Sequence, residues 1–127
     1  MKLFFLLLFS SYLSFAQTKA DYQIVMGKYK KFYNNWEADS LSKMISDEAP
    51  NKKYYKWDGY LIEYCHKTRG EMKYYKYMGE ALSSEGEVFK VVYSSKTYAY
   101  FIILDKNDCI LNLKVGDERY IDSFIKN

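Results

Sequence analysis

Length, composition and charge set the first limits on function. The chain has 127 residues and a formal net charge of only +3, whereas a dedicated nucleic-acid binder usually carries a strong basic stripe. We therefore expect no nucleic-acid partner. The 15 tyrosines are compatible with stacking sites for flat ligands, but tyrosine also suits half-buried strand positions, so composition alone does not identify a binding site.

The first 16 residues have the order of a secretory signal peptide. Lys2 gives a basic start, an apolar run follows over residues 3–9, and the small residues Ser14 and Ala16 precede a cut at Gln17. The run is shorter than the roughly 20 residues that a membrane anchor needs. The sequence therefore predicts cleavage before Gln17 and export to the periplasm or the extracellular space. We expect no stable membrane span after cleavage.

Apolar residues at three- and four-residue spacing predict three helices in the first half of the chain. The first runs from Ala20 to Trp36. The second covers residues 39–46, with Asp39 as its cap. The third runs from Tyr55 to Thr68, and Gly70 follows as its stop because glycine accepts the left-handed conformation. The apolar stripe predicted for this third helix consists of Trp57, Leu61, Tyr64, Cys65 and Thr68.

After the third helix the pattern changes to alternation, which predicts strands over residues 71–81, 87–93, 97–104 and 109–115. We expect the last two strands to be central and joined by a polar turn over residues 105–108. Helices followed by a strand meander are typical of the α+β class, with helices covering one face of a curved antiparallel sheet. No repeat or linker divides residues 17–127, so we expect a single domain there.

Alternation also assigns side chains to faces. In the first strand it places Met72, Tyr74 and Met78 on one face and Tyr75 and Tyr77 on the other. In the last strand it groups four residues on the face toward the core: Cys109, Leu111, Leu113 and Val115.

The order of elements resembles the nuclear transport factor 2-like superfamily, the cone-shaped α+β fold shared with ketosteroid isomerase. The resemblance spans Ala20 to Val115 and is carried by "FYNNWEADSLSKMIS", "KTRGEMKYY" and "AYFIILDKNDCILNLKV". It implies three N-terminal helices packed on a curved four-stranded antiparallel sheet, with a pocket between the helices and the concave face. Enzymatic relatives place an acidic base and a tyrosine donor in that pocket. No motif of this chain matches those positions, so no catalytic residue is carried over.

Two cysteines and one histidine are the remaining reactive side chains. Cys65 and Cys109 are both expected to face the core, and disulfides persist in exported proteins. Two alternatives therefore stay open: the cysteines form a disulfide bridge, or they remain two unpaired buried thiols. His66 is next to Cys65, but neighbouring helix residues point about 100° apart, so we expect a surface histidine. We expect no metal site, because no further ligand has suitable spacing.

The leading functional hypothesis is an exported, non-catalytic binding domain for a small apolar ligand or an unknown envelope protein. The chain has no phosphate loop, nucleophile elbow or zinc-protease motif, and we expect no cofactor. The alternative is a small pocket enzyme of isomerase or hydrolase type, with a raised-pKa carboxylate beside a tyrosine. A homodimer through the sheet is a third option. The aromatic candidates for ligand binding are Tyr74, Tyr75, Tyr77, Tyr98 and Tyr100.

Overall fold

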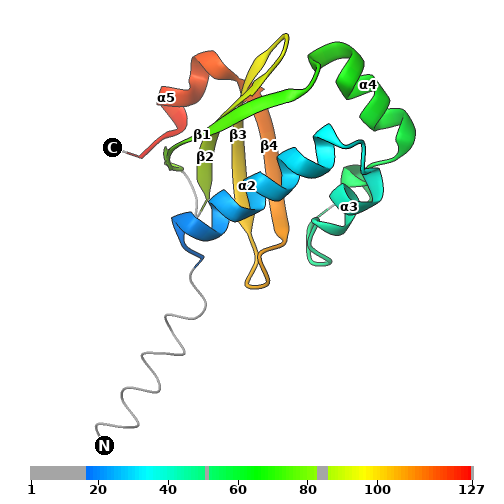
Figure 1. Cartoon of the computed structure of the whole chain (residues 1–127). Coiled ribbons are helices and arrows are strands. Elements are labelled where there is room, and N and C mark those ends of the chain that lie inside the picture. Colours follow the sequence, from blue (N-terminus) through cyan, green and yellow to red (C-terminus); the bar gives the residue numbers. More distant parts are fainter. Residues whose placement is uncertain (1–16, 51, 83–85, 127) are drawn as a thin grey trace, which may run out of the picture.

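The computed structural model of the protein describes residues 17–50, 52–82 and 86–126. The predicted signal peptide over residues 1–16 lies outside the described residues. Within the described part, helices precede a strand meander and a short helix follows it (Figure 1). No helix there is long and apolar enough to cross a membrane.

Four strands form one antiparallel sheet in the order β1-β2-β3-β4. They are β1 (Met72–Glu80), β2 (Glu87–Tyr93), β3 (Thr97–Leu104) and β4 (Ile110–Asp117). The α+β class and the four-stranded antiparallel sheet are thus confirmed. β4 lies at an edge of the sheet, so the prediction that both strands of the last hairpin are central is wrong for β4.

The first described helix, α2 (Lys19–Asn34), begins at a capping box. The Thr18 hydroxyl accepts a hydrogen bond from the Asp21 N–H, and the Asp21 carboxylate accepts one from the Thr18 N–H. Such reciprocal bonds satisfy amide groups that have no partner inside the helix. The next helix, α3 (Ala38–Lys43), is capped at Glu37. Asp39 lies inside its first turn, so its predicted role as cap is wrong.

Helix α4 (Gly59–Arg69) begins later than predicted because Asp58 caps it, accepting a hydrogen bond from the Leu61 N–H at 2.7 Å. The preceding segment forms a short 3-10 turn, η1 (Lys52–Tyr55). Gly70 ends α4 with a φ of 80°, as the sequence predicts. The apolar stripe predicted for this helix is only partly correct. Its buried residues are Ile62 and Cys65, whereas Leu61 and Tyr64 are exposed.

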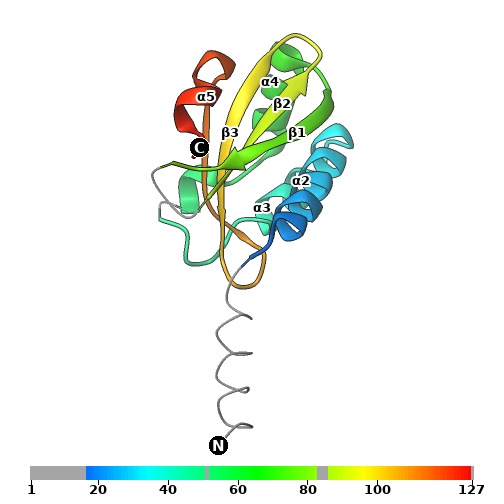
Figure 2. The ribbon, with the colours of Figure 1, turned by 90° about the vertical axis from the view of Figure 1, so that its left-hand side faces the viewer.

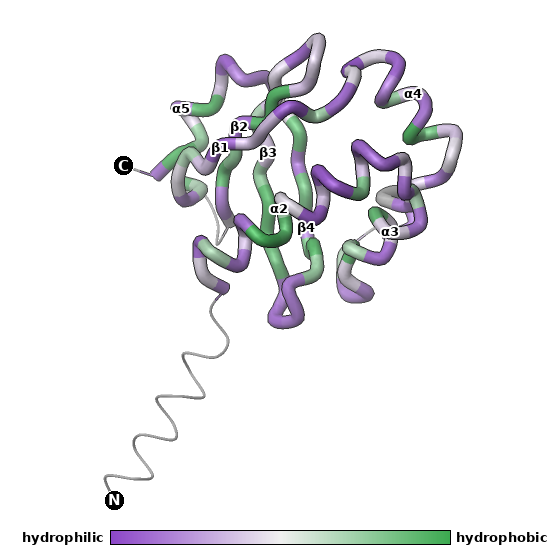
Figure 3. Tube along the Cα trace, in the orientation of Figure 1, coloured by the Kyte–Doolittle hydropathy of each residue, from purple (hydrophilic) through white to green (hydrophobic). Residues whose placement is uncertain are grey.

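The sheet has two different faces, which we call the inner face and the outer face. Helices α2 and α3 lie on the inner side, and α5 (Ile121–Phe124) lies on the opposite side (Figure 2). Apolar residues concentrate along the strands of the sheet (Figure 3). A large cluster of buried residues fills the inner side. Among the described residues, the outer cluster has four buried members, Ala81, Val88, Ala99 and Ile121, with Met78, Phe101 and Ile125 packed against them.

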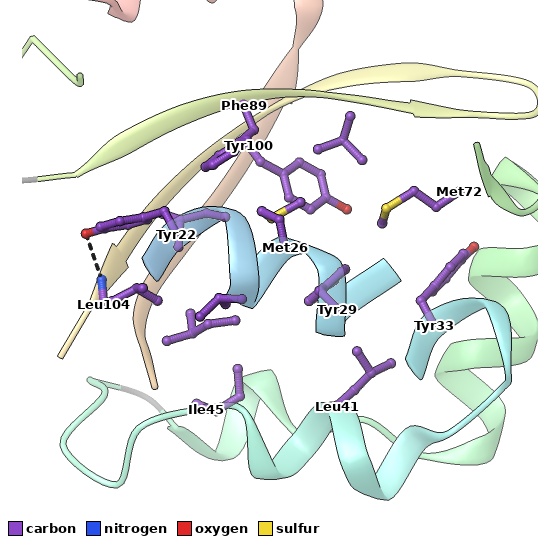
Figure 4. Close-up of a cluster of buried hydrophobic side chains, with 14 of the residues drawn as sticks. Tyr22, Met26, Tyr29, Tyr33, Leu41, Ile45, Met72, Phe89, Tyr100 and Leu104 are labelled. Carbon is purple, nitrogen blue, oxygen red and sulfur yellow. Dashed lines mark hydrogen bonds between the residues drawn. The ribbon is translucent and has the colours of Figure 1, made fainter. Parts of the chain in front are cut away.

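The inner core combines aromatic side chains of α2 and the central strands with aliphatic ones such as Leu41 and Ile45 (Figure 4). Tyr29 meets Tyr100 edge-on, with ring centroids 6.0 Å apart. The Tyr22 hydroxyl accepts a hydrogen bond from the buried Leu104 N–H at 3.1 Å. The Tyr33 hydroxyl donates to the Gly70 carbonyl at 2.7 Å. These bonds allow phenol groups to be buried at little cost, because an unpaired buried polar group would destabilise the fold.

The faces of β1 differ from the predicted alternation because the pairing with β2 shifts twice, between Met72 and Tyr74 and between Tyr77 and Gly79. An extra residue in one strand reverses the face of the residues beyond it. Met72 consequently packs in the inner core together with Tyr75 and Tyr77. Its predicted grouping with Tyr74 is therefore wrong.

Both edge strands are partly covered by other segments of the chain. At β4, Ile110 donates to the Met44 carbonyl at 2.7 Å and accepts from the Ser46 N–H at 2.8 Å. At β1, the Leu82 N–H donates to the Phe124 carbonyl at 2.7 Å, and the Lys126 N–H donates to the Glu80 carbonyl at 2.8 Å. A Cβ at Gly79 would come within 2.7 Å of the Ile125 side chain, and its φ is 144°. Glycine at this bulge therefore permits the close approach of Ile125.

Candidate ligand pocket

A pocket of about 230 Å³ lies on the outer face of the sheet, between β3, β4 and helix α5. It is mostly apolar, which is typical of ligand pockets. Its lining residues are Val88, Ala99, Tyr100, Phe101, Lys114, Val115, Gly116 and Phe124.

The hollow results from a pair of small residues on the outer face, near one end of the β3–β4 ladder. Ala99 in β3 pairs with Gly116 in β4, and directly opposed strand residues share one face. A Cβ built on Gly116 would meet no other heavy atom within 4 Å. The next pair on the same face of the sheet is Phe101 with Lys114, and its longer side chains form a wall beside the small pair. A pair of small residues beside a pair of large ones therefore creates the depression.

Among the described residues, Lys114 is the only charged one that lines the pocket. Its ammonium nitrogen lies 5.9 Å from the centre of the Phe101 ring. The nearby Lys90, whose pairing partner is Ala99, lies 4.0 Å from the carboxylate of Glu118. The part of the chain that the structure describes contributes no carboxylate, thiol or imidazole to the lining. The described lining therefore offers apolar contacts and one ammonium group, which suit the binding of a partly apolar molecule.

The space between the helices and the sheet, where the resemblance implies a pocket, is occupied by the inner core. Tyr33, Phe89 and Tyr100 are almost completely buried there. Because the Tyr100 ring packs in that core, Tyr100 can contribute only its backbone to the outer pocket. The structure thus fills the space in which the resemblance implies a pocket, and the apolar pocket described above lies on the other face of the sheet.

The five tyrosines predicted as ligand contacts are distributed over several environments. Tyr74 is exposed, at 51% of its full surface. The Tyr75 hydroxyl lies 3.4 Å from the Gln23 carbonyl, and the Tyr77 hydroxyl donates to the Glu87 carboxylate at 2.7 Å. Tyr98 packs beneath an arginine. Of the five, Tyr100 alone lines the outer pocket, so the structure does not gather them into one site.

Tyr77 and Glu87 form a carboxylate–tyrosine pair at the end of the β1–β2 ladder. Burial raises the pKa of Glu87, and the hydrogen bond from Tyr77 offsets only part of that effect. Burial, together with the neighbouring Glu87 carboxylate, raises the pKa of Tyr77 to about 12. Lys19 places its ammonium group 4.4 Å from the centre of the Tyr77 ring. Neither Tyr77 nor Glu87 lines the outer pocket.

Cys65 and Cys109 are both free thiols in the structure, so the alternative of a bridge between them is not realised. Cys65 is buried in the inner core, whereas Cys109 precedes β4 and is partly exposed. Ile110 takes the core position that the alternation assigned to Cys109. Burial raises the pKa of both thiols, and the carboxylates of Asp105 and Asp47 raise that of Cys109 further. Protonated thiols are weak nucleophiles.

His66 is not the surface residue that the sequence predicts. Its ring is half-buried and stacks between Tyr33 and Trp36, with centroids 4.2 Å and 4.0 Å away. Its Nε2 lies 2.7 Å from the Tyr33 carbonyl oxygen. Within the described residues, no group of three or more histidine, cysteine, aspartate or glutamate side chains could hold a metal ion.

The β3–β4 turn holds a second cluster of polar groups. Asp105 accepts hydrogen bonds from the Ser46 hydroxyl at 2.5 Å and from the backbone N–H groups of Asn107 and Cys109 at 2.8 and 3.0 Å. Burial alone would raise the pKa of Asp105, but these hydrogen bonds outweigh it and hold the pKa below its ordinary value. The turn is therefore stabilised by an ionised carboxylate.

Comparison with family models, with curated proteins and with solved structures finds no match to this chain. The resemblance to the nuclear transport factor 2-like superfamily therefore stays a prediction. Sequence reasoning also missed the outer pocket. The only sequence cue was the outward position of Ala99 and Gly116 on neighbouring strands, and using it requires the register between β3 and β4.

Proposed function

We propose that this protein is a non-catalytic binding domain that holds a small apolar molecule with a negatively charged end in the outer-face pocket. The observation that carries the proposal is the hollow over the Ala99–Gly116 pair, which is walled by apolar side chains and has Lys114 at its rim. An apolar body would replace water over this depression. A carboxylate at the end of the ligand would lie beside the Lys114 ammonium group.

The size of the pocket limits the ligand class. Its volume of about 230 Å³ is below the range of roughly 300–1,000 Å³ that is usual for drug-sized ligands. A medium-chain fatty acid or a small aromatic carboxylate fits this limit better than a lipid or a large cofactor. Phe124 is 49% exposed, so a bound molecule would also cover part of an apolar side chain that now faces solvent.

Gly116→Leu is the decisive variant because a side chain at this position extends into open space within the pocket. Octanoate and benzoate serve as probes, and binding is followed by amide shifts in two-dimensional NMR spectra. We expect saturable shifts at Val88, Ala99 and Phe124 in the unchanged protein and none in Gly116→Leu.

Gly59→Leu is the matched control, because a Cβ at Gly59 also meets no heavy atom within 4 Å but lies in the first turn of α4. This variant should bind both probes as the unchanged protein does. Undiminished binding by a folded Gly116→Leu protein would reject the outer pocket as the site. Absence of any saturable shift with either probe would reject the proposed ligand class.

The role of the charge is tested by Lys114→Met. An exposed ion pair contributes about 1 kcal/mol at most, which is about fivefold in affinity. We therefore expect up to fivefold weaker binding of octanoate and unchanged binding of octanol. Lys76→Met is the control, because Lys76 pairs with Lys90 on the same face of the sheet but does not line the pocket. An equal loss in both variants would contradict a specific role for Lys114.

A second candidate is a small enzyme of isomerase or hydrolase type, and the Tyr77–Glu87 pair is the observation that favours it. A buried carboxylate with a raised pKa beside a tyrosine is a pattern that acid–base catalysis uses. We rank it second because neither residue lines the outer pocket. An ester and enone substrate panel tests it: turnover abolished in Glu87→Gln would support an enzyme, and no turnover by the unchanged protein would remove this candidate.

The remaining proposals concern location, family and assembly. We propose that residues 1–16 direct export and are removed; a mature protein whose N-terminus is not Gln17 would contradict this cleavage site.

The helix-then-meander order supports a cone-shaped fold of the nuclear transport factor 2-like kind. A second copy of the chain is the competing occupant of the outer face. Sedimentation that shows a dimer disrupted by Gly116→Leu would favour that occupant over the small ligand.

A further inference from the structure

The two arginines of the chain have contrasting surroundings. Arg119 lies in η2 (Glu118–Tyr120), exposes 75% of its side chain and contacts the Asp117 carboxylate at 3.1 Å. Arg69 is half-buried at the end of α4. Its guanidinium carbon lies 4.7 Å from the centre of the Tyr98 ring and 5.7 Å from that of Tyr93. Among the described residues, none supplies a carboxylate within 4.0 Å of Arg69.

The position of the Arg69 guanidinium over the Tyr98 ring leaves its hydrogen-bonding capacity unused. A guanidinium stacks through its flat face, while its five N–H groups point outward in the plane. No hydrogen bond within the described part of the chain engages these N–H groups or the Tyr98 hydroxyl; the described hydrogen bonds at Arg69 go from Ser95 to its main-chain carbonyl. The donors at this position are therefore available to a ligand.

The neighbours of Arg69 do not supply a counter-charge. Burial raises the pKa of Tyr93, Tyr100 and Cys65, so all three stay neutral at neutral pH. A partly buried cation without a counter-ion is costly, because it loses hydration without gaining a partner. An anion from solution would offset this cost.

The backbone of Arg69 is held in place from the β2–β3 turn. Ser95 donates to the Arg69 carbonyl from its N–H at 3.0 Å and from its hydroxyl at 2.9 Å. Directly after it, a Cβ at Gly70 would lie 2.7 Å from the Ser94 side chain, which shows how closely the turn packs there. The Arg69 side chain therefore extends from a fixed point, and less conformational entropy is lost when a ligand binds.

We propose that Arg69 and the Tyr98 hydroxyl form a binding site for a small oxyanion, a phosphate or a carboxylate, at the end of the inner face. The planar fork of Arg69 matches two oxygens of either group. Tyr98 provides the surface on which the guanidinium stacks and one further donor. This site is separate from the outer pocket, because Tyr98 packs against the inner core, and it does not depend on the function proposed there.

The full mature chain is titrated with sodium phosphate and with sodium acetate at constant ionic strength, and the Nε–Hε signals of the two arginines are followed by NMR. We expect the Arg69 signal to shift and saturate, whereas the Arg119 signal serves as internal reference for nonspecific ion effects. Saturation with phosphate alone identifies a phosphate site, and saturation with acetate identifies a carboxylate site. A linear response of Arg69 to both salts, equal to that of Arg119, would overturn the proposal.

Variants separate the site from the fold. Arg69→Lys keeps the charge but loses the bidentate fork, and we expect about tenfold weaker anion binding. Tyr98→Phe keeps the stacking ring and removes only the hydroxyl, so it should fold normally and bind about threefold more weakly. Arg119→Lys is the matched control and should bind as the unchanged protein does. Unchanged anion affinity in a folded Tyr98→Phe and a folded Arg69→Lys protein would overturn the assignment.

Discussion

The two faces of the sheet are built from the same strands but differ in how completely they are filled. On the inner face, Tyr100 and Phe89 pair with each other and are buried against α2. One position earlier in β3, Ala99 faces outward and meets Gly116, and the space above this pair is open. The comparison indicates that the inner face provides most of the stability, while the outer face retains open space.

The tyrosines show the same division. On the inner side, phenol hydroxyls complete buried hydrogen bonds, as between Tyr93 and Tyr100 or from Leu104 to Tyr22. Tyr74, which lies outside both buried clusters, is exposed and its hydroxyl has no hydrogen bond within the described residues. Tyr22, Tyr29, Tyr33, Tyr93 and Tyr100 are buried in this core, so the presence of tyrosine alone does not indicate a stacking site.

The largest expected effect comes from truncating an aromatic ring on each face. Phe89→Ala removes a ring that is 0% exposed, so we expect the free energy of unfolding to fall by about 3–5 kcal/mol. Phe124→Ala on the outer side should cost less than about 1 kcal/mol, because its ring is already half solvated. Urea denaturation measures both. Equal losses would show that the two faces contribute equally to stability.

A smaller effect is expected from removing one buried hydroxyl. Tyr22→Phe keeps the ring but deprives the buried Leu104 N–H of its acceptor, and an unsatisfied buried donor costs about 1–3 kcal/mol. Tyr74→Phe is the control and should change the free energy of unfolding by less than about 0.5 kcal/mol, as an exposed substitution does. If thermal and urea unfolding place both variants at the same stability, the Tyr22 hydrogen bond contributes nothing measurable.

The smallest effects concern pH, and two carboxylates should respond with opposite sign. The folded protein raises the pKa of Glu87 above its unfolded value of 4.5. The stabilising contribution of Glu87 is therefore complete below that value and is lost as pH rises through the folded pKa. Asp105 has a lowered pKa, so its contribution is present above its unfolded value of 3.8 and is lost as pH falls.

The measurement is the free energy of unfolding against pH for the unchanged protein, Glu87→Gln and Asp105→Asn. Relative to the unchanged protein, Glu87→Gln should gain stability as pH rises from about 4 to 7. Asp105→Asn should be least stable, relative to the unchanged protein, at neutral pH, and the difference should narrow below about pH 4. Parallel curves for all three proteins would contradict both pKa shifts.

Periodicity was sufficient for the class of fold and for most of the elements. Helical spacing located α2 and α4 and alternation located all four strands, because each of these elements buries one face. The helix starts were less accurate, since Asp58 and Asp39 are equally plausible caps by residue type. Only the packing of the segment before each helix decides that Asp58 caps α4 and that Asp39 lies within α3.

The features that the sequence did not reveal depend on register and on tertiary contact. The bulge near Lys73 moves Met72 into the core with Tyr75, and no residue type in "EMKYYKYMGEA" marks an insertion of this kind. The outer pocket requires that Ala99 stand opposite Gly116, which is a relation between strands. His66 was predicted at the surface because helical spacing gives no information on Trp36, whose ring covers it from a separate segment.

The contact of residues 124–126 with β1 has a consequence for self-assembly of the protein. The Lys126 N–H donates a hydrogen bond to the Glu80 carbonyl, and the Phe124 carbonyl accepts one from the Leu82 N–H. The Ile125 side chain covers Gly79. A chain shortened by proteolysis before Phe124 would expose this end of β1 as an unpaired strand edge, the kind of surface on which other chains add as strands. We expect such a fragment to form intermolecular β-structure, whereas in the full chain residues 124–126 cover this edge.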